Sequence, residues 1–202
     1  MSTPAAPETK QQPASPHNPE SGAAESTLLA AAERGDVSAV RHGIEAAAGV
    51  EVQFRALNLA GVRAAEAGRQ GVLEFCLDRE AELGGGAPDE YEDYLCVAAE
   101  CGRLDLLRWL HGRGATNFGG AISTAAAHGQ EAAFMLCREL GGASTDGALD
   151  AAIEAAAEGG HLAMVQRCLD WGATNFDGAR ECALAAGQTA VLALLEAALK
   201  ED

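Results

Sequence analysis

Short apolar stretches alternate with glycines along most of the chain, and the alternation recurs. From about residue 26 onwards, each unit shows an alanine-rich stretch, a glycine, and then a segment whose apolar residues are three to four positions apart. That spacing is typical of one face of an α-helix. The glycines that mark the units are Gly35, Gly68, Gly102, Gly129, Gly160 and Gly187. The pattern predicts six units, each with a short helix, a glycine turn and a second, amphipathic helix.

Three positions relative to these glycines support the same register. Four residues before each glycine stands an alanine, at positions 31, 64, 98, 125, 156 and 183. Five residues after it stand Val40, Leu73, Leu107, Phe134, Val165 and Leu192, and eight residues after it stand Gly43, Cys76, Leu110, Cys137, Cys168 and Leu195. We expect the alanines to let helices approach closely, the two later columns to form the core, and the glycines to adopt a left-handed helix end.

Composition and charge narrow the fold and the partners. Aromatic residues make up only 4% of the chain while alanine and leucine dominate, which favours an all-α fold. The net charge of −16 leaves the chain without the positive charge that nucleic acids or anionic membranes attract. No apolar stretch is long enough to span a membrane, and no signal peptide is evident. We expect no nucleic-acid partner, no membrane span and a reducing, cytoplasmic setting.

The first residues differ in composition from the rest. Residues 1–25 contain five of the six prolines, together with Ser, Thr, Gln and Asn, and no large aliphatic residue other than Met1. Such a segment cannot bury enough apolar surface to offset the entropy lost on ordering. We therefore predict a disordered tail over 1–25 and a repeat domain over 26–202, with a capping residue at Ser26 or Thr27 opening the first helix.

The cysteines and histidines are the residues that could act in catalysis or metal binding, and the sequence favours a structural role for them. The six cysteines form no CxxC pair and show no zinc-finger spacing, and Cys76, Cys137 and Cys168 occupy a predicted core column. No histidine has a Ser, Cys or carboxylate at a spacing that indicates a catalytic triad. We therefore expect no metal, no cofactor and no enzymatic activity.

The segment AAEGGHLAMVQRCLDWGATNF (156–176) resembles the ankyrin repeat, whose middle reads A-A-x-x-G-H before an amphipathic helix and G-A. The resemblance extends over residues 28 to 199 and implies an ankyrin-like solenoid of about six degenerate repeats. It also implies that His161 hydrogen-bonds neighbouring backbone. The T-P-L-H start of the family's first helix is absent, so hairpins or simple loops could join the repeats. This degenerate style is similar to the ankyrin-like proteins of large DNA viruses.

The resemblance further implies that the two residues before each turn glycine face a concave, protein-binding side. Four of the six units place Glu first there, so an acidic row facing a partner with a basic patch is one interpretation; the other is that Glu is simply a good exposed helix former. The candidate binding residues are Glu33, Arg34, Glu66, Glu100, His128 and Glu158. By the same resemblance, the protein would be a scaffold or adaptor in a host cytoplasm or a virion. The alternative is a structural subunit of a larger particle held by its N-terminal tail.

Overall fold

A computed structural model describes residues 19–85, 90–141 and 147–199. Within these residues the chain forms twelve α-helices and no β-strand, so the predicted all-α class is confirmed. The helices are α1 (Pro19–Arg34), α2 (Val37–Glu45), α3 (Val50–Ala67), α4 (Gln70–Glu82), α5 (Glu90–Glu100), α6 (Leu104–Gly112), α7 (Phe118–Ala127), α8 (Glu131–Gly141), α9 (Leu149–Gly159), α10 (Leu162–Asp170), α11 (Phe176–Ala185) and α12 (Thr189–Ala198).

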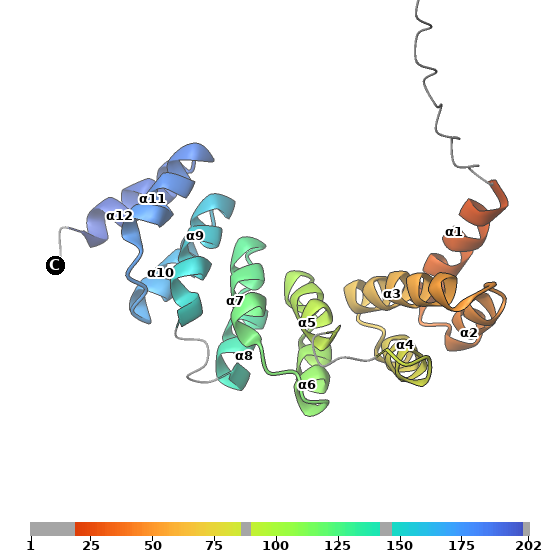
Figure 1. Ribbon diagram of the computed structural model, residues 1–202. Helices are drawn as coiled ribbons and strands as arrows, with labels where there is room; N and C mark the ends of the chain where they lie inside the picture. The colour runs from red at the N-terminus through yellow and green to blue at the C-terminus, as the bar shows by residue number, and fades with distance from the viewer. Residues whose placement is uncertain (1–18, 86–89, 142–146, 200–202) are drawn as a thin grey trace, which may run out of the picture.

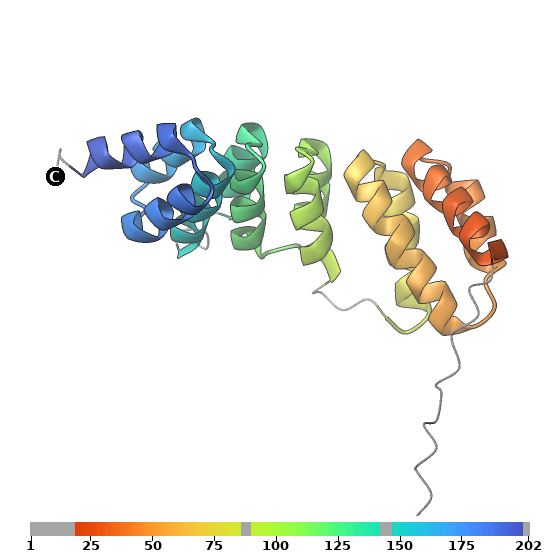
Figure 2. The same ribbon diagram turned by 90° about the horizontal axis from the view of Figure 1, so that it is seen from above.

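Consecutive helices form six antiparallel pairs that stand side by side in chain order (Figure 1). The first helix of each pair packs against the first helix of the next, from α1 through α3, α5, α7 and α9 to α11. Figure 2, seen from above, shows this row of odd-numbered helices, with the even-numbered helices forming a second layer beneath it. Each pair therefore buries its apolar residues chiefly against its neighbours, which is how repeat proteins build a continuous core.

Every pair turns at its marker glycine through the same hydrogen bonds. All six glycines have a positive φ, between 64° and 83°. The N–H of the next residue donates to the carbonyl of the alanine four before the glycine, over 2.7 to 3.0 Å, and the glycine N–H donates to the carbonyl three before it. This is the Schellman arrangement that ends a helix on a left-handed residue. The predicted glycine turns are confirmed.

The alanine and core columns are also confirmed. All six alanines four residues before the glycines are at most 1% exposed. Five of the six residues in the first core column are fully buried, and Leu192 is half-buried. In the second column Gly43 is half-buried, and the other five are fully buried. Small side chains at the helix–helix contact and larger ones behind it account for the close packing of the row.

The start of the repeat domain requires a correction. Helix α1 begins at Pro19, and Ser26 lies inside it rather than capping it. Thr27 accordingly donates its hydroxyl to the carbonyl of Ala23, four residues earlier, over 2.9 Å. A proline suits the first turn of a helix, and the alanines and glutamate that follow favour its continuation. The rest of the predicted tail, residues 1–18, lies outside the described residues.

Candidate binding surface

In the second, third, fifth and sixth helix pairs, the residue after the turn glycine connects the pair to the one before it. Arg69 Nε donates to the Glu33 carbonyl over 2.8 Å, and Arg103 Nε donates to the Glu66 carbonyl over 2.7 Å. Further along the row, Gln188 Nε2 donates to the Glu158 carbonyl over 3.0 Å, and His161 Nε2 lies 2.9 Å from the Ala127 carbonyl. We call these four donors the bridging residues: Arg69, Arg103, His161 and Gln188.

The bridging contact of His161 confirms the role that the ankyrin resemblance implied for it. A carbonyl oxygen can only accept, so this contact requires the proton on Nε2 of the His161 ring. The bridging side chains also lie directly over the preceding turn glycines. A Cβ added at Gly68 would be 3.3 Å from Arg103 Cδ, and one added at Gly129 would be 2.7 Å from His161 Nδ1. A glycine is thus needed at these turns for both backbone conformation and space.

The first pair uses the same position differently. Asp36 follows Gly35, and its carboxylate accepts a hydrogen bond from the Ala39 N–H over 3.0 Å, which caps α2. The bridging residues cap no N–H group of their own helices with their side chains. No helix pair precedes α1 in the described part of the chain, so the position reverts to an ordinary N-cap there.

The bridging bonds occupy backbone carbonyls and leave the side chains at the same positions in solvent. The six candidate residues lie at the C-terminal ends of first helices: Glu33 and Arg34 in α1, Glu66 in α3, Glu100 in α5, His128 after α7 and Glu158 in α9. Glu66 is half-buried, and the other five are exposed. Ala127 interrupts the row of acids, as the sequence predicted.

Local contacts modify the charge of this row. Arg63 pairs with Glu66 over 2.8 Å within α3, and His128 Nε2 lies 3.4 Å from the Glu100 carboxylate of the neighbouring pair. Of the six candidates, the structure thus brings together Glu100 and His128. Exposed pairs of this kind contribute little to stability and are screened by salt. We call the four acids Glu33, Glu66, Glu100 and Glu158 the acidic row.

A second set of hydrogen bonds between helix pairs lies at the other end of the first helices. It was not predicted from the sequence. Asp150 of α9 accepts hydrogen bonds from the Thr174 and Asn175 N–H groups over 2.6 and 3.0 Å, and these bonds lower the pKa of Asp150. Glu92 of α5 accepts from Asn117 Nδ2 over 3.0 Å. Both acids stand ten residues before a turn glycine. The repeated Asn in the two GATNF segments was the available signal.

Three of the six cysteines are buried in the core, as predicted, and the other three are half-buried. Cys76, Cys137 and Cys168 are fully buried, and burial raises the pKa of each thiol to about 12. Burial also raises the pKa of Cys96, Cys101 and Cys182, and all six cysteines are free thiols. Thiolate is the reactive form of cysteine, so these residues are poor nucleophiles at neutral pH.

No group of three His, Cys, Asp or Glu side chains in the described ranges is placed to hold a metal ion. No helix among those described has both the length and the apolar character needed to cross a membrane. The sequence matches no protein-family model and no curated protein. The geometry of the chain itself therefore carries the functional argument.

Proposed function

We propose that this protein is a non-enzymatic protein-binding scaffold with an ankyrin-like build, and that its partner contacts the ends of the first helices along the acidic row. The observation that carries the proposal is the division of roles at these helix ends. The backbone carbonyls of Glu33, Glu66 and Glu158 bond to the next pair, which fixes the helices in register, and the side chains of the row remain exposed or half-buried. A rigid, repeated surface of this kind is what solenoid proteins use for binding.

The charge of the row selects the class of partner. Three of the four acids are exposed and the fourth is half-buried, and the whole chain carries a net charge of −16. A partner with a basic patch would be steered towards this surface, and the association would weaken as salt increases. The helix ends are held by their neighbours, so binding needs little reordering of the backbone.

Charge reversal on the acidic row tests the proposal. Immobilised wild-type protein and a Glu66→Lys plus Glu100→Lys variant are compared for captured proteins, with quantification of each protein by mass spectrometry. The matched control is Glu51→Lys plus Glu139→Lys, which makes the same charge change at two exposed positions outside the row. We expect at least one captured protein to be lost from the row variant and retained by the control. An identical set of captured proteins for all three baits would contradict the proposal.

A further inference from the structure

The contact between the second and third helix pairs differs from the other contacts along the row. At each of the other contacts, the first of the two pairs carries a buried large aliphatic residue seven positions before its own turn glycine. These residues are Leu28, Leu95, Ile122 and Ile153. Eight residues before the glycine of the pair that follows stands a buried alanine: Ala60, Ala121, Ala152 and Ala179. Between the second and third pairs these positions hold Gly61 and Tyr94, so the large and small residues are exchanged.

The exchange is a close fit. A Cβ added at Gly61 would meet the Tyr94 hydroxyl oxygen at 2.5 Å and its ring carbon Cζ at 2.9 Å. Tyr94 is 2% exposed, so its ring lies in the contact rather than over it. The tyrosine hydroxyl thus enters a layer that is apolar at the other contacts of the row. The second pair also has the longest first helix, because α3 runs from Val50 to Ala67.

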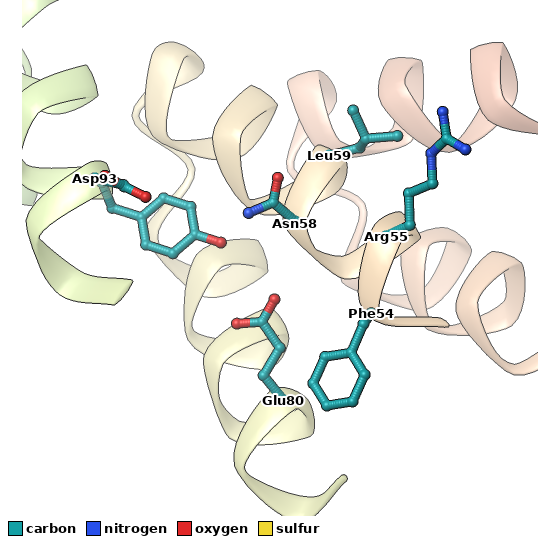
Figure 3. A pocket seen from close by; sticks show the side chains of 7 residues that line it. Phe54, Arg55, Asn58, Leu59, Glu80 and Asp93 are labelled. Carbon is teal, nitrogen blue, oxygen red and sulfur yellow. The ribbon is translucent and has the colours of Figure 1, made fainter. Parts of the chain in front are cut away.

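A pocket of about 500 Å³ opens beside this exchange, between α3, α4 and α5. Its size lies within the range of small-ligand sites. Figure 3 shows the Glu80 side chain entering it from α4, with its carboxylate directed towards Asn58 of α3, and the Phe54 ring next to the Glu80 stem. Asp93 and Tyr94 line the pocket from α5. The pocket therefore combines an apolar wall with carboxyl acceptors from two helices, α4 and α5.

The electrostatics of the pocket favour a cation. Glu80 is 4% exposed and is the one charged residue in the described ranges that is buried. A carboxylate offers about four acceptor positions, so it can bond to a ligand in addition to protein groups. Asp93 adds a second, exposed carboxyl group, and the guanidinium of Arg55 at the rim is turned away from Glu80 in Figure 3. A positive group that reaches Glu80 would meet a carboxyl group that is itself shielded from water, at the inner end of a partly open pocket.

The shape of the lining narrows the ligand further. Phe54 and Leu59 provide apolar contact for a hydrocarbon stem, and an aromatic face also attracts a planar cation. Glu80 and Asp93 present carboxyl acceptors from different helices, which suits a donor group with several N–H bonds in one plane. A guanidinium on an aliphatic stem has these properties.

We propose that this pocket binds an arginine side chain of a partner protein. The inference rests on the proposed function, because it takes the ligand to be part of a protein. The pocket would be a second contact site for the partner. It lies near the opposite end of the first helices from the acidic row, and the partner would supply an arginine to it. Glu80 accepts from the guanidinium, Asn58 and Asp93 flank it, and Phe54 covers the stem.

A titration with a defined probe tests the pocket without a partner. The full chain labelled with ¹⁵N is titrated with N-acetyl-arginine amide, and the signals of the Gly61 and Gly85 backbone amides and the Asn58 side-chain amide are followed. Gly85 is chosen because it lies against the Phe54 ring, 2.7 Å from Cε1 to an added Cβ. N-acetyl-citrulline amide, which has the same shape without the charge, is the control ligand. We expect saturable shifts with the arginine probe and none with the citrulline probe.

Two variants assign the binding to the pocket. Glu80→Gln removes the carboxylate with little change in shape. It should weaken binding and raise the dissociation constant about tenfold or more. Glu82→Gln removes an exposed charge from the same helix, outside the pocket, and should leave the constant unchanged. Asn58→Ala, at an exposed position, provides a second pocket variant if Glu80→Gln unfolds. Equal shifts with both probes, or equal constants for Glu80→Gln and wild type, would overturn the inference.

A peptide separates the two sources of a guanidinium group. A ten-residue Gly/Ser peptide with one central arginine should bind more tightly than the capped amino acid, because a protein segment makes further contacts with the long α3. Equal constants would overturn the assignment to a partner protein in favour of a small guanidinium compound. Failure of the pocket and failure of the scaffold are distinguishable. A chain that binds the probe but captures no row-dependent protein contradicts the scaffold, and the reverse result contradicts the pocket.

Discussion

Two contacts along the row, one between the fifth and sixth helix pairs and one between the second and third, can be compared directly. They have the same backbone arrangement but different side chains. In both, a residue after a turn glycine donates to a carbonyl of the preceding pair, Gln188 to Glu158 and Arg103 to Glu66. Between the fifth and sixth pairs, Ile153 and Ala179 are both buried at the two exchanged positions. Between the second and third pairs, Gly61 and Tyr94 take those positions and a pocket opens. The backbone thus fixes the register, and side chains can vary locally to create a site.

The largest expected effect comes from forcing the regular side chain into the exchanged contact. Gly61→Leu would place a side chain where the Tyr94 hydroxyl lies, and overpacking of this kind costs about 1–3 kcal/mol of unfolding free energy. Adding Tyr94→Ala restores the large–small order of the other contacts and should recover most of the loss. Urea denaturation of the single variants and the double variant measures this. Additive losses in the double variant would show that the two positions are not complementary.

A smaller effect, equal at both contacts, is expected from the bridging residues. Arg103→Met and Gln188→Met each remove one hydrogen bond to an exposed carbonyl and keep the apolar stem, so each should cost about 1 kcal/mol. Thermal unfolding of the two variants tests the equality. A cost at Arg103 several times that at Gln188 would mean that the second and third pairs differ in their backbone connection as well as in their side chains.

The smallest effect concerns pH and one of the two contacts. Backbone N–H groups lower the folded pKa of Asp150, so its contribution to stability is present above the unfolded pKa of about 3.9 and is lost as pH falls through the folded pKa. Asn58 occupies the same position in the second pair and cannot titrate. Below about pH 4 we expect loosening around Trp171, seen in its fluorescence in a Trp109→Phe background. Asp150→Asn should remove this pH dependence, and an unchanged acid transition would contradict it.

Much of the fold could be predicted from the sequence because the same residue requirement recurs at the same position in several repeats. The glycine turns and the buried alanines were predicted from six parallel occurrences each, so a single exception such as Gly43 did not obscure the register. The start of α1 was missed because Ser26 followed by an apolar run is a typical helix start. The composition of residues 1–25 also pointed to disorder, although Pro19 and the alanines after it allow helix.

The candidate surface was predicted in its positions but not in its connections. Glu33, Glu66, Glu100, His128 and Glu158 lie at helix ends as expected, whereas the bridging role was foreseen for His161 alone. Arg69, Arg103 and Gln188 share its position after a turn glycine, and that polar column was the available signal. The pocket was missed because it depends on an exception: Tyr94 stands where the other pairs that follow carry alanine. Spacing shows which positions align, but not what volume an exchanged pair leaves beside it.

The bridging bonds have a consequence for how this chain can be rearranged. A bond from a side chain to a backbone carbonyl depends little on the identity of the residue that supplies the carbonyl, so the bridging bonds by themselves would tolerate many substitutions at the ends of the first helices. The contact between the second and third pairs tolerates less, because the glycine of one pair leaves room for the tyrosine of the other. These two modules are matched and must remain neighbours, so any shortened or extended form of the protein that keeps the pocket must keep them together.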